Sequence, residues 1–124
     1  MRLLLDTHVV LWWWQDSRRL GRAVRSAIAG AAVVYVSAAS AWEVVIKMAI
    51  GRLQLADSFE SHVDAAGFEA LPITFAHAAE AGRLPPHHAD PFDRMLVGQA
   101  RVERLVLVTH DEQIKAYDVE MLLV

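Results

Sequence analysis

Three short runs of apolar residues alternate with longer segments of helical periodicity. The runs cover residues 3–5 (LLL), 33–36 (VVYV) and 105–108 (LVLV), and each is apolar at both alternating positions. Strands that are buried on both faces, as in a parallel sheet covered by helices, have this pattern. We therefore predict three central strands at these positions.

Two further segments are weaker strand candidates. The first begins at Phe68 (FEALPI), where Pro72 favours an edge strand or a strand end, and the second is the C-terminal VEMLLV. Helical patterns fill the gaps, at residues 19–29, 39–50, 58–66, 76–82 and 91–103. Strands and helices that alternate at this spacing predict an α/β protein with three layers, α/β/α, around a central, mostly parallel sheet.

The chain has the length and the apolar content of one domain. Its 124 residues, 55% of them hydrophobic, suffice for a single packed core, so we expect one domain over residues 1–124. The longest apolar run, residues 9–14, is too short to span a bilayer, and the first residues lack the pattern of a signal peptide. The absence of cysteine is compatible with a reducing compartment. We expect a cytoplasmic protein that is not bound to a membrane.

The net charge of −3 limits how the chain can bind nucleic acid. Proteins that bind nucleic acid mainly through phosphates usually carry a positive balance. A nucleic-acid role here therefore requires a local basic patch or a metal ion. Arg18, Arg22 and Arg25 fall on one face of a predicted helix, but such a stripe is more often a solvated face.

Four acidic residues follow the predicted strands closely. Asp6 comes directly after the first strand, and Asp111 closes the segment LVLVTHD. Glu43 lies about one turn into the helix after the second strand, and Asp93 lies in the first turn of the helix that feeds the last central strand. Ligands of open α/β sheets bind at the carboxyl ends of the strands. We expect these four carboxylates to converge there.

Each acid also has a purely structural explanation. Asp6 and Asp111 could cap the helices that follow them. Asp90 before Pro91 is a good N-cap, and Asp93 at the third helical position suits the helix dipole. Glu43 and Lys47 form an i,i+4 pair of the orientation that supports an exposed helix. For Asp90 the structural role is the stronger prediction, and for Asp111 the two readings are balanced.

Taken together, the four acids favour a metal site. Glu43 and Asp93 each share a helical face with apolar residues, so both should lean inward, where a charge needs a partner. Few cations lie close in sequence, Arg94 among them. Carboxylates gathered without cations normally hold hard divalent ions, and oxygen ligands favour Mg²⁺ or Mn²⁺.

The histidines offer a competing interpretation. His8, His87, His88 and His110 all lie near an acid, and histidine with carboxylate is typical of zinc or iron sites. However, no HExxH spacing occurs, and adjacent histidines on a loop rarely point at one ion. We therefore favour magnesium or manganese over zinc.

The chain contains the motifs LLLDTH, VSAASAWEVVIK, LPPHHADPFDRMLVGQA and LVTHD, in this order. In order and spacing they resemble the motifs of PIN domains, and specifically of the VapC-like toxins of toxin–antitoxin pairs. The resemblance covers almost the whole chain. It departs at LQLADS, which lacks a proline common there, and at YDVEML, which has aspartate where glycine is common.

The resemblance implies a PIN-like fold and a metal-dependent endoribonuclease. Asp6, Glu43, Asp93 and Asp111 match the family's catalytic acids. Asp6 and Asp93 would be the firmest ligands of Mg²⁺ or Mn²⁺, and the other two would complete the site directly or through water. The implied partners are an RNA substrate, a cognate antitoxin protein and a second copy of the chain in a homodimer.

The segment VVLWWW suggests a surface for such partners. Three successive tryptophans on a helix point about 100° apart and cannot all face one sheet. Exposed aromatic groups often mark protein–protein sites. Either the helix of Trp12 to Trp14 contributes to an antitoxin or dimer surface, or it is sunk between the sheet and neighbouring helices.

Two other functions remain as alternatives. A receiver-like phosphotransfer domain also has an acidic pocket at its strand ends, but it needs a lysine at a late strand end. The only lysines, Lys47 and Lys115, do not lie there. A catalytically inactive RNA- or protein-binding PIN module is disfavoured because all four acids are present.

Overall fold

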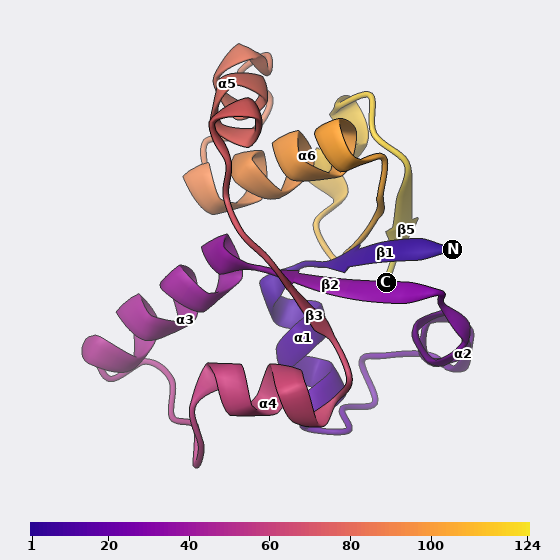
Figure 1. Ribbon diagram of the computed structural model, residues 1–124, viewed down its shortest axis with the longest axis vertical. Helices are drawn as coiled ribbons and strands as arrows, with labels where there is room; N and C mark the ends of the chain where they lie inside the picture. Colours follow the sequence, from indigo (N-terminus) through magenta and orange to yellow (C-terminus); the bar gives the residue numbers. More distant parts are fainter.

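The computed structural model describes residues 1–124 and contains one five-stranded sheet with helices on both faces (Figure 1). The strands are β1 (Arg2–Leu5), β2 (Val33–Ser37), β3 (Glu69–Leu71), β4 (Val106–Thr109) and β5 (Met121–Leu123). The helices are α1 (Thr7–Trp14), α2 (Arg22–Gly30), α3 (Ala38–Ala49), α4 (Phe59–Ala65), α5 (Phe75–Arg83) and α6 (Pro91–Glu103), with a short 3₁₀ helix, η1 (Glu112–Ala116). The sheet confirms the predicted α/β class.

Strand β1 lies at the centre of the sheet. The order is β3-β2-β1-β4-β5, and all four neighbouring pairs are parallel. Leu3, Leu4 and Leu5 are fully buried, because β1 has a strand on each side and helices on both faces. Every strand therefore ends at the same edge of the sheet, and the residue after β1 lies in the middle of that edge.

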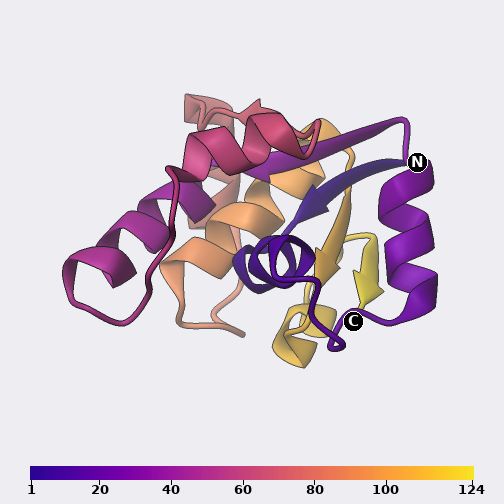
Figure 2. The same ribbon diagram turned by 90° about the horizontal axis from the view of Figure 1, so that it is seen from below.

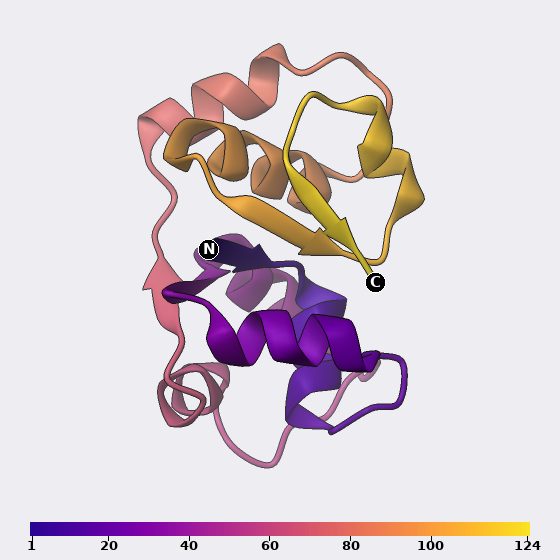
Figure 3. The same cartoon turned by 90° about the vertical axis from the view of Figure 1, so that its right-hand side faces the viewer.

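Two apolar clusters cover the two faces of the sheet. On one face, Leu3 and Leu5 pack with residues of α1, α2 and α4. On the other face, Leu4 packs with α6, the start of α3 and η1. Successive side chains of a strand point to opposite faces, so three consecutive leucines serve both cores. Figures 1 and 3 show the resulting three layers, with α5 lying on the outer side of α6, and Figure 2 looks onto the face that α1, α2 and α4 cover.

The two helices α5 and α6 pack closely because of a glycine. A methyl group at Gly98 of α6 would lie 2.9 Å from the backbone nitrogen of Ala81 and 3.1 Å from the carbonyl oxygen of His77, both in α5. Backbone atoms at this distance cannot give way as a flexible side chain would. Gly98 therefore sets the distance between α5 and α6, and α6 in turn positions Asp93.

The three central strands and both weaker strands were predicted within one or two residues, and α6 was predicted with the correct bounds. β3 is an edge strand, as Pro72 indicated.

One helix prediction was wrong at its start. α2 begins at Arg22 and not at residue 19, because residues 17–20 form a turn with the Leu20 N–H bonded to the Ser17 carbonyl at 3.2 Å. Arg18 therefore lies outside the helix, and the predicted three-arginine face does not form. Arg25 pairs with Asp16 at 2.8 Å and donates to the Ser17 carbonyl, so it stabilises this turn.

The tryptophan helix α1 is enclosed on most sides. Trp12 is buried, and its ring packs edge-on against His110. Trp13 and Trp14 are half-buried, with Trp13 against Phe68 and Trp14 against α4. The large apolar side chains that are most exposed lie elsewhere, including several on or next to α3, namely Trp42, Val45, Met48 and Ile50.

Helices of the length and hydropathy needed to cross a membrane do not occur in the structure.

Candidate metal centre

Asp6 lies at the centre of the rim formed by the strand ends and is buried. Its Oδ1 accepts a hydrogen bond from the N–H of Val9 (2.9 Å), so Asp6 caps α1 as an N-cap. Its Oδ2 accepts from the hydroxyl of Thr109 (2.6 Å), the last residue of the neighbouring strand β4, and from the N–H of His110 (3.2 Å), the residue after it. These bonds hold the carboxylate in one orientation. Oδ2 accepts two of them, whereas Oδ1 accepts one and retains a lone pair that can bind a cation.

Glu43 reaches the same rim from α3. Its Oε1 accepts from the hydroxyl of Thr7 at 2.6 Å, which ties α3 to the start of α1. Its Oε2 pairs with Lys47 at 3.2 Å. The expectation that the acids gather without cationic partners is therefore wrong for Glu43, because the i,i+4 spacing on α3 brings Lys47 within reach.

Asp93 is the acid without a structural role. It lies in the first turn of α6, but the cap of that helix is Asp90, whose Oδ1 accepts from the N–H groups of Phe92 and Asp93 itself. Burial, the neighbouring charge of Asp90 and, more weakly, those of Asp6 and Asp111 raise the pKa of Asp93 from 3.8 to about 7, against the opposing effect of His88. A cation bound nearby would stabilise the charged form of a carboxyl group in this position.

Asp111 has both structural and site contacts. Its Oδ1 accepts from the N–H of Gln113 (2.9 Å) and caps η1. Its Oδ2 lies 2.5 Å from Nε2 of His88. Burial alone would raise the pKa of Asp111, but the hydrogen bonds from His88 and Gln113 and the charges of His88 and His110 outweigh it, so this pKa is lowered. Asp111 therefore remains a carboxylate when Asp93 is protonated.

A pocket of about 290 Å³ opens above these groups, and none of its lining residues is hydrophobic. All four predicted acids line it, together with Thr7, His8, Asp90, His110 and Glu112. His88, Asp93 and Asp111 offer ligand atoms that all lie within 4.8 Å of one another. Four acids far apart in the sequence therefore border one polar pocket.

Arg94, although next to Asp93 in sequence, is turned away from the pocket. Its guanidinium donates to the carbonyl oxygens of Ala81 (3.2 Å) and Leu84 (2.9 Å), and also to other groups of the loop before α6. It holds that loop in place and does not neutralise the acids. Among the acids of the rim, only Glu43 is paired with a lysine or an arginine.

Sequence reasoning missed three polar residues of the rim. Thr7 and Thr109 donate to Glu43 and Asp6, and each is next to a strand end, which is a signal that could have indicated them. His88 was set aside because it lies in a loop beside another histidine. The fold brings it between Asp93 and Asp111, and no periodicity in the sequence marks this position.

The donor set fits a hard divalent cation. The pocket offers carboxylate oxygens of Asp6, Asp93, Asp111 and Glu43, and oxygen ligands are those that Mg²⁺ and Mn²⁺ prefer. The raised pKa of Asp93 reflects burial first and neighbouring negative charges second, and a bound divalent ion would offset both.

The fold and the pocket together define an α/β protein with a candidate divalent-cation site at the carboxyl ends of its parallel strands. The chain belongs to the PIN domain family, because the PIN domain model matches residues 3–120. It is 32% identical over 123 residues to Ribonuclease VapC22 of Mycobacterium tuberculosis. The aligned region covers 93% of this chain and 91% of that protein.

Solved structures agree with this fold. A chain of the VapBC2 structure from Rickettsia felis, bound to a DNA fragment from the promoter, matches with a TM-score of 0.75 and 12% identity, over 100% of this chain and 99% of that one. A chain of DNA-bound VapBC from Salmonella typhimurium matches with a TM-score of 0.70 and 16% identity, over 98% and 97%. At these identities the likeness shows the fold alone.

Proposed function

We propose that this protein is a divalent-metal-dependent endoribonuclease that acts as the toxin of a toxin–antitoxin pair. The observation that carries the proposal is Asp93, a largely buried carboxyl with a raised pKa that faces Asp6 and Asp111 and caps nothing. A fold does not need such a group, whereas a cation site does. The similarity to a protein named as a ribonuclease, at 32% identity over almost the whole chain, supports the same conclusion.

The residues of the rim have distinct roles in this proposal. Asp6 and Asp93 would hold the ion, with Glu43 and Asp111 completing the site directly or through water. The chemistry that Mg²⁺ or Mn²⁺ would supply there is the activation of a water for in-line attack on a phosphodiester and the stabilisation of charge on the leaving oxygen. Thr109 and the backbone of His110 fix Asp6, and Thr7 fixes Glu43, so the carboxylates are oriented before RNA binds.

A bound metal ion would also help RNA to bind, because the protein itself has a net charge of −3. A negative protein repels RNA, and the pocket itself is acidic. The arginine face predicted on α2 does not form, and Arg25 is engaged with Asp16. Attraction of the phosphate at the cleavage point would therefore depend on the bound cation. RNA as substrate also implies that the protein acts in the cytoplasm.

An antitoxin is the proposed protein partner, since the structural neighbours are toxin–antitoxin complexes. The exposed apolar side chains of α3, Trp42 and Val45 among them, offer a larger apolar surface for a partner than the enclosed helix α1. A contribution of α1 and the formation of a homodimer remain predictions of this proposal. Binding of a coexpressed antitoxin to the Trp42→Ser variant, compared with the parent, measures the role of α3.

A receiver-like phosphotransfer domain is the competing function. It requires a lysine at a late strand end, and the end of β4 carries Thr109, His110 and Asp111 instead. Lys47 lies in the last turn of α3 and pairs with Glu43. An inactive PIN module is the other alternative, and the cleavage experiment distinguishes it.

The experiment compares RNA cleavage by the parent and by matched variants. Purified protein with cellular RNA and Mg²⁺ or Mn²⁺ should give endonucleolytic products, and EDTA should abolish them. Asp93→Asn and Asp6→Asn should each lose cleavage and growth inhibition, because a charged ligand becomes neutral. Asp90→Asn is the comparison and should be milder, since asparagine is also a good N-cap, although Asp90 lines the same pocket. Greater damage from Asp90→Asn would reverse the assignment within the sequence DPFD.

A further inference from the structure

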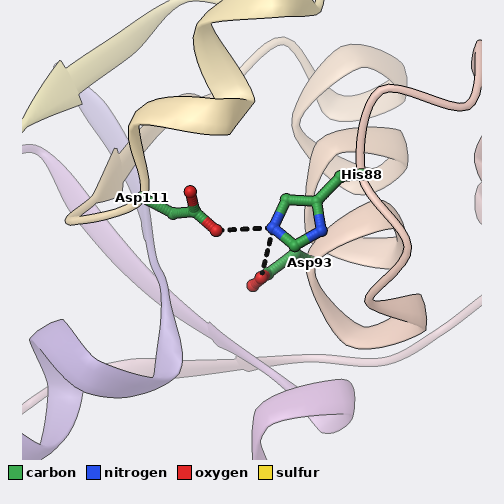
Figure 4. Close-up of side chains that lie close together, drawn as sticks. All are labelled: His88, Asp93 and Asp111. Carbon is green, nitrogen blue, oxygen red and sulfur yellow. Dashed lines mark hydrogen bonds and ion pairs between the residues drawn. The ribbon is translucent and has the colours of Figure 1, made fainter.

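His88 is the polar residue of the rim to which no role has yet been given. It lies in the loop before α6, and its side chain is only 10% exposed. Figure 4 shows its ring between the two carboxylates, with Nε2 pointing at both. Nε2 lies 2.5 Å from Oδ2 of Asp111 and 3.2 Å from Oδ2 of Asp93. Because of this position, His88 is either a third metal ligand or a donor that orients the ligands.

The other side of the ring decides between these roles. The backbone N–H of Asp90 donates to Nδ1 of His88 at 3.1 Å. A backbone N–H is always a donor, so Nδ1 has to be the acceptor and cannot carry a hydrogen. The hydrogen of the neutral ring is therefore on Nε2, the atom that faces the carboxylates. A nitrogen that carries a hydrogen has no free lone pair for a metal ion.

The backbone of His88 is fixed as firmly as its ring. Its N–H donates to the hydroxyl of Tyr117 at 2.9 Å, and its carbonyl oxygen accepts from Arg94 at 3.4 Å. The Tyr117 hydroxyl in turn donates to the carbonyl of Pro85 at 2.8 Å. Four hydrogen-bonding groups of one loop residue are thus engaged, and rotation of the ring to present a bare nitrogen would break the bond from Asp90.

We propose that His88 is a positioning residue whose Nε2–H fixes the carboxylate of Asp111 beside Asp93, and that it does not bind the metal ion itself. This inference rests on the proposed function, since it assigns a role within that cation site. Asp111 then has one oxygen bonded to His88 and the other to the N–H of Gln113. It contributes its charge to the pocket in a fixed orientation, while the direct ligands are Asp6 and Asp93.

Two amide substitutions test the contacts of the two ring nitrogens one at a time. In His88→Gln the amide nitrogen lies about where Nε2 lies, so the donor to Asp111 is retained. In His88→Asn the amide oxygen lies about where Nδ1 lies, so the contact with the Asp90 N–H is retained and the donor to Asp111 is lost. His87→Asn is the control, because His87 is exposed and packs on the ring of Tyr117 without contacting the acids.

The measurements are Mn²⁺ affinity, from the electron paramagnetic resonance signal of the free ion, and the resonance spectrum of the bound ion. His88→Asn should weaken Mn²⁺ binding by roughly 10- to 100-fold, as expected when a residue that orients a ligand is removed. His88→Gln and His87→Asn should stay within about threefold of the parent, a ratio that corresponds to well under the 1.4 kcal/mol of a tenfold change. The bound ion in the parent should show no coupling to an imidazole nitrogen.

Nitrogen NMR of the histidine-labelled, metal-free parent tests the ring itself, without any variant. At mildly alkaline pH the His88 ring should show the hydrogen on Nε2. The opposite tautomer, or imidazole coupling in the Mn²⁺ spectrum of the parent that disappears in His88→Gln, would overturn the inference and make His88 a ligand; His8 and His110 also line the pocket, and their coupling would persist in this variant. Equal Mn²⁺ affinity of His88→Asn and the parent would overturn it as well, while leaving the proposed function intact. A parent that binds no Mn²⁺ would overturn both.

Discussion

Replacement of Asp93 by asparagine should stabilise the metal-free protein while abolishing its activity. The charged form of Asp93 is disfavoured first by burial and then by the charges of Asp90, Asp6 and Asp111, and these effects raise its pKa to about 7. Asp93 caps no helix, so asparagine at this position removes a charge without removing a cap. An active site that keeps such a group trades stability for function.

The magnitude follows from the two pKa values. A carboxyl with a pKa of 3.8 in the unfolded chain and about 7 in the folded protein opposes folding at pH 8 by roughly 4 kcal/mol, at about 1.36 kcal/mol for each pKa step. Asp93 is partly exposed, and solvent screening reduces this to roughly 2 kcal/mol. Because the folded state binds the proton more tightly, this penalty is absent below about pH 4, grows between about pH 4 and pH 7, and is constant above that.

The assay is thermal or urea unfolding of the parent and Asp93→Asn in EDTA, at about pH 5 and about pH 8. At each pH, the unfolding free energy of the parent is subtracted from that of the variant. This difference should be larger at pH 8 than at pH 5 by roughly 1 kcal/mol, which corresponds to about 4 °C in Tm. Titrating groups that do not interact with Asp93 cancel in this difference. Mg²⁺ at about 100 times its Kd should then stabilise the parent by about 2.7 kcal/mol and the variant much less. A metal-free variant that is less stable than the parent at pH 8 would refute the reasoning.

Two further predictions concern the scaffold. Gly98→Ala should destabilise the protein by roughly 1–3 kcal/mol, because the new methyl group would lie 2.9 Å from the nitrogen of Ala81. Gly82→Ala in α5 should stabilise it by roughly 0.5–1 kcal/mol, because a methyl group there meets nothing within 4 Å. Chemical denaturation measures both, and similar values for the two would contradict the account of helix packing. Trp14→Ala should cost roughly 2 kcal/mol, since Trp14 packs against α4, whereas Trp42→Ala, 61% exposed, should change stability by less than about 0.5 kcal/mol. A larger loss from Trp42→Ala would mean that α3 is packed differently.

The sequence predicts the fold well because strand and helix periods are local signals. Leu3 to Leu5 read as a strand buried on both faces, and both faces are covered in the structure. The start of α2 could not be predicted from periodicity, since the turn at residues 17–20 depends on Arg25, which lies in α2 and donates to the carbonyls of Ser17 and Leu20.

The site is predictable where topology alone determines position. Asp6, Glu43, Asp93 and Asp111 follow or precede strands that end at one edge, so their convergence follows from a parallel sheet. The position of His88 does not, because it depends on contacts of a loop with α6 and η1 that no local pattern encodes.

Metal-dependent hydrolysis of RNA is the central claim, and the chemistry of the cut ends tests it most directly. If water attacks the phosphodiester, one product carries a terminal monophosphate and the other a hydroxyl, without a cyclic phosphate. We expect these ends from the parent with Mg²⁺ or Mn²⁺, and no cleavage with EDTA or with Asp93→Asn. Cleavage that persists in EDTA, or ends that carry the cyclic phosphate formed by attack of the ribose 2′-hydroxyl, would contradict the account.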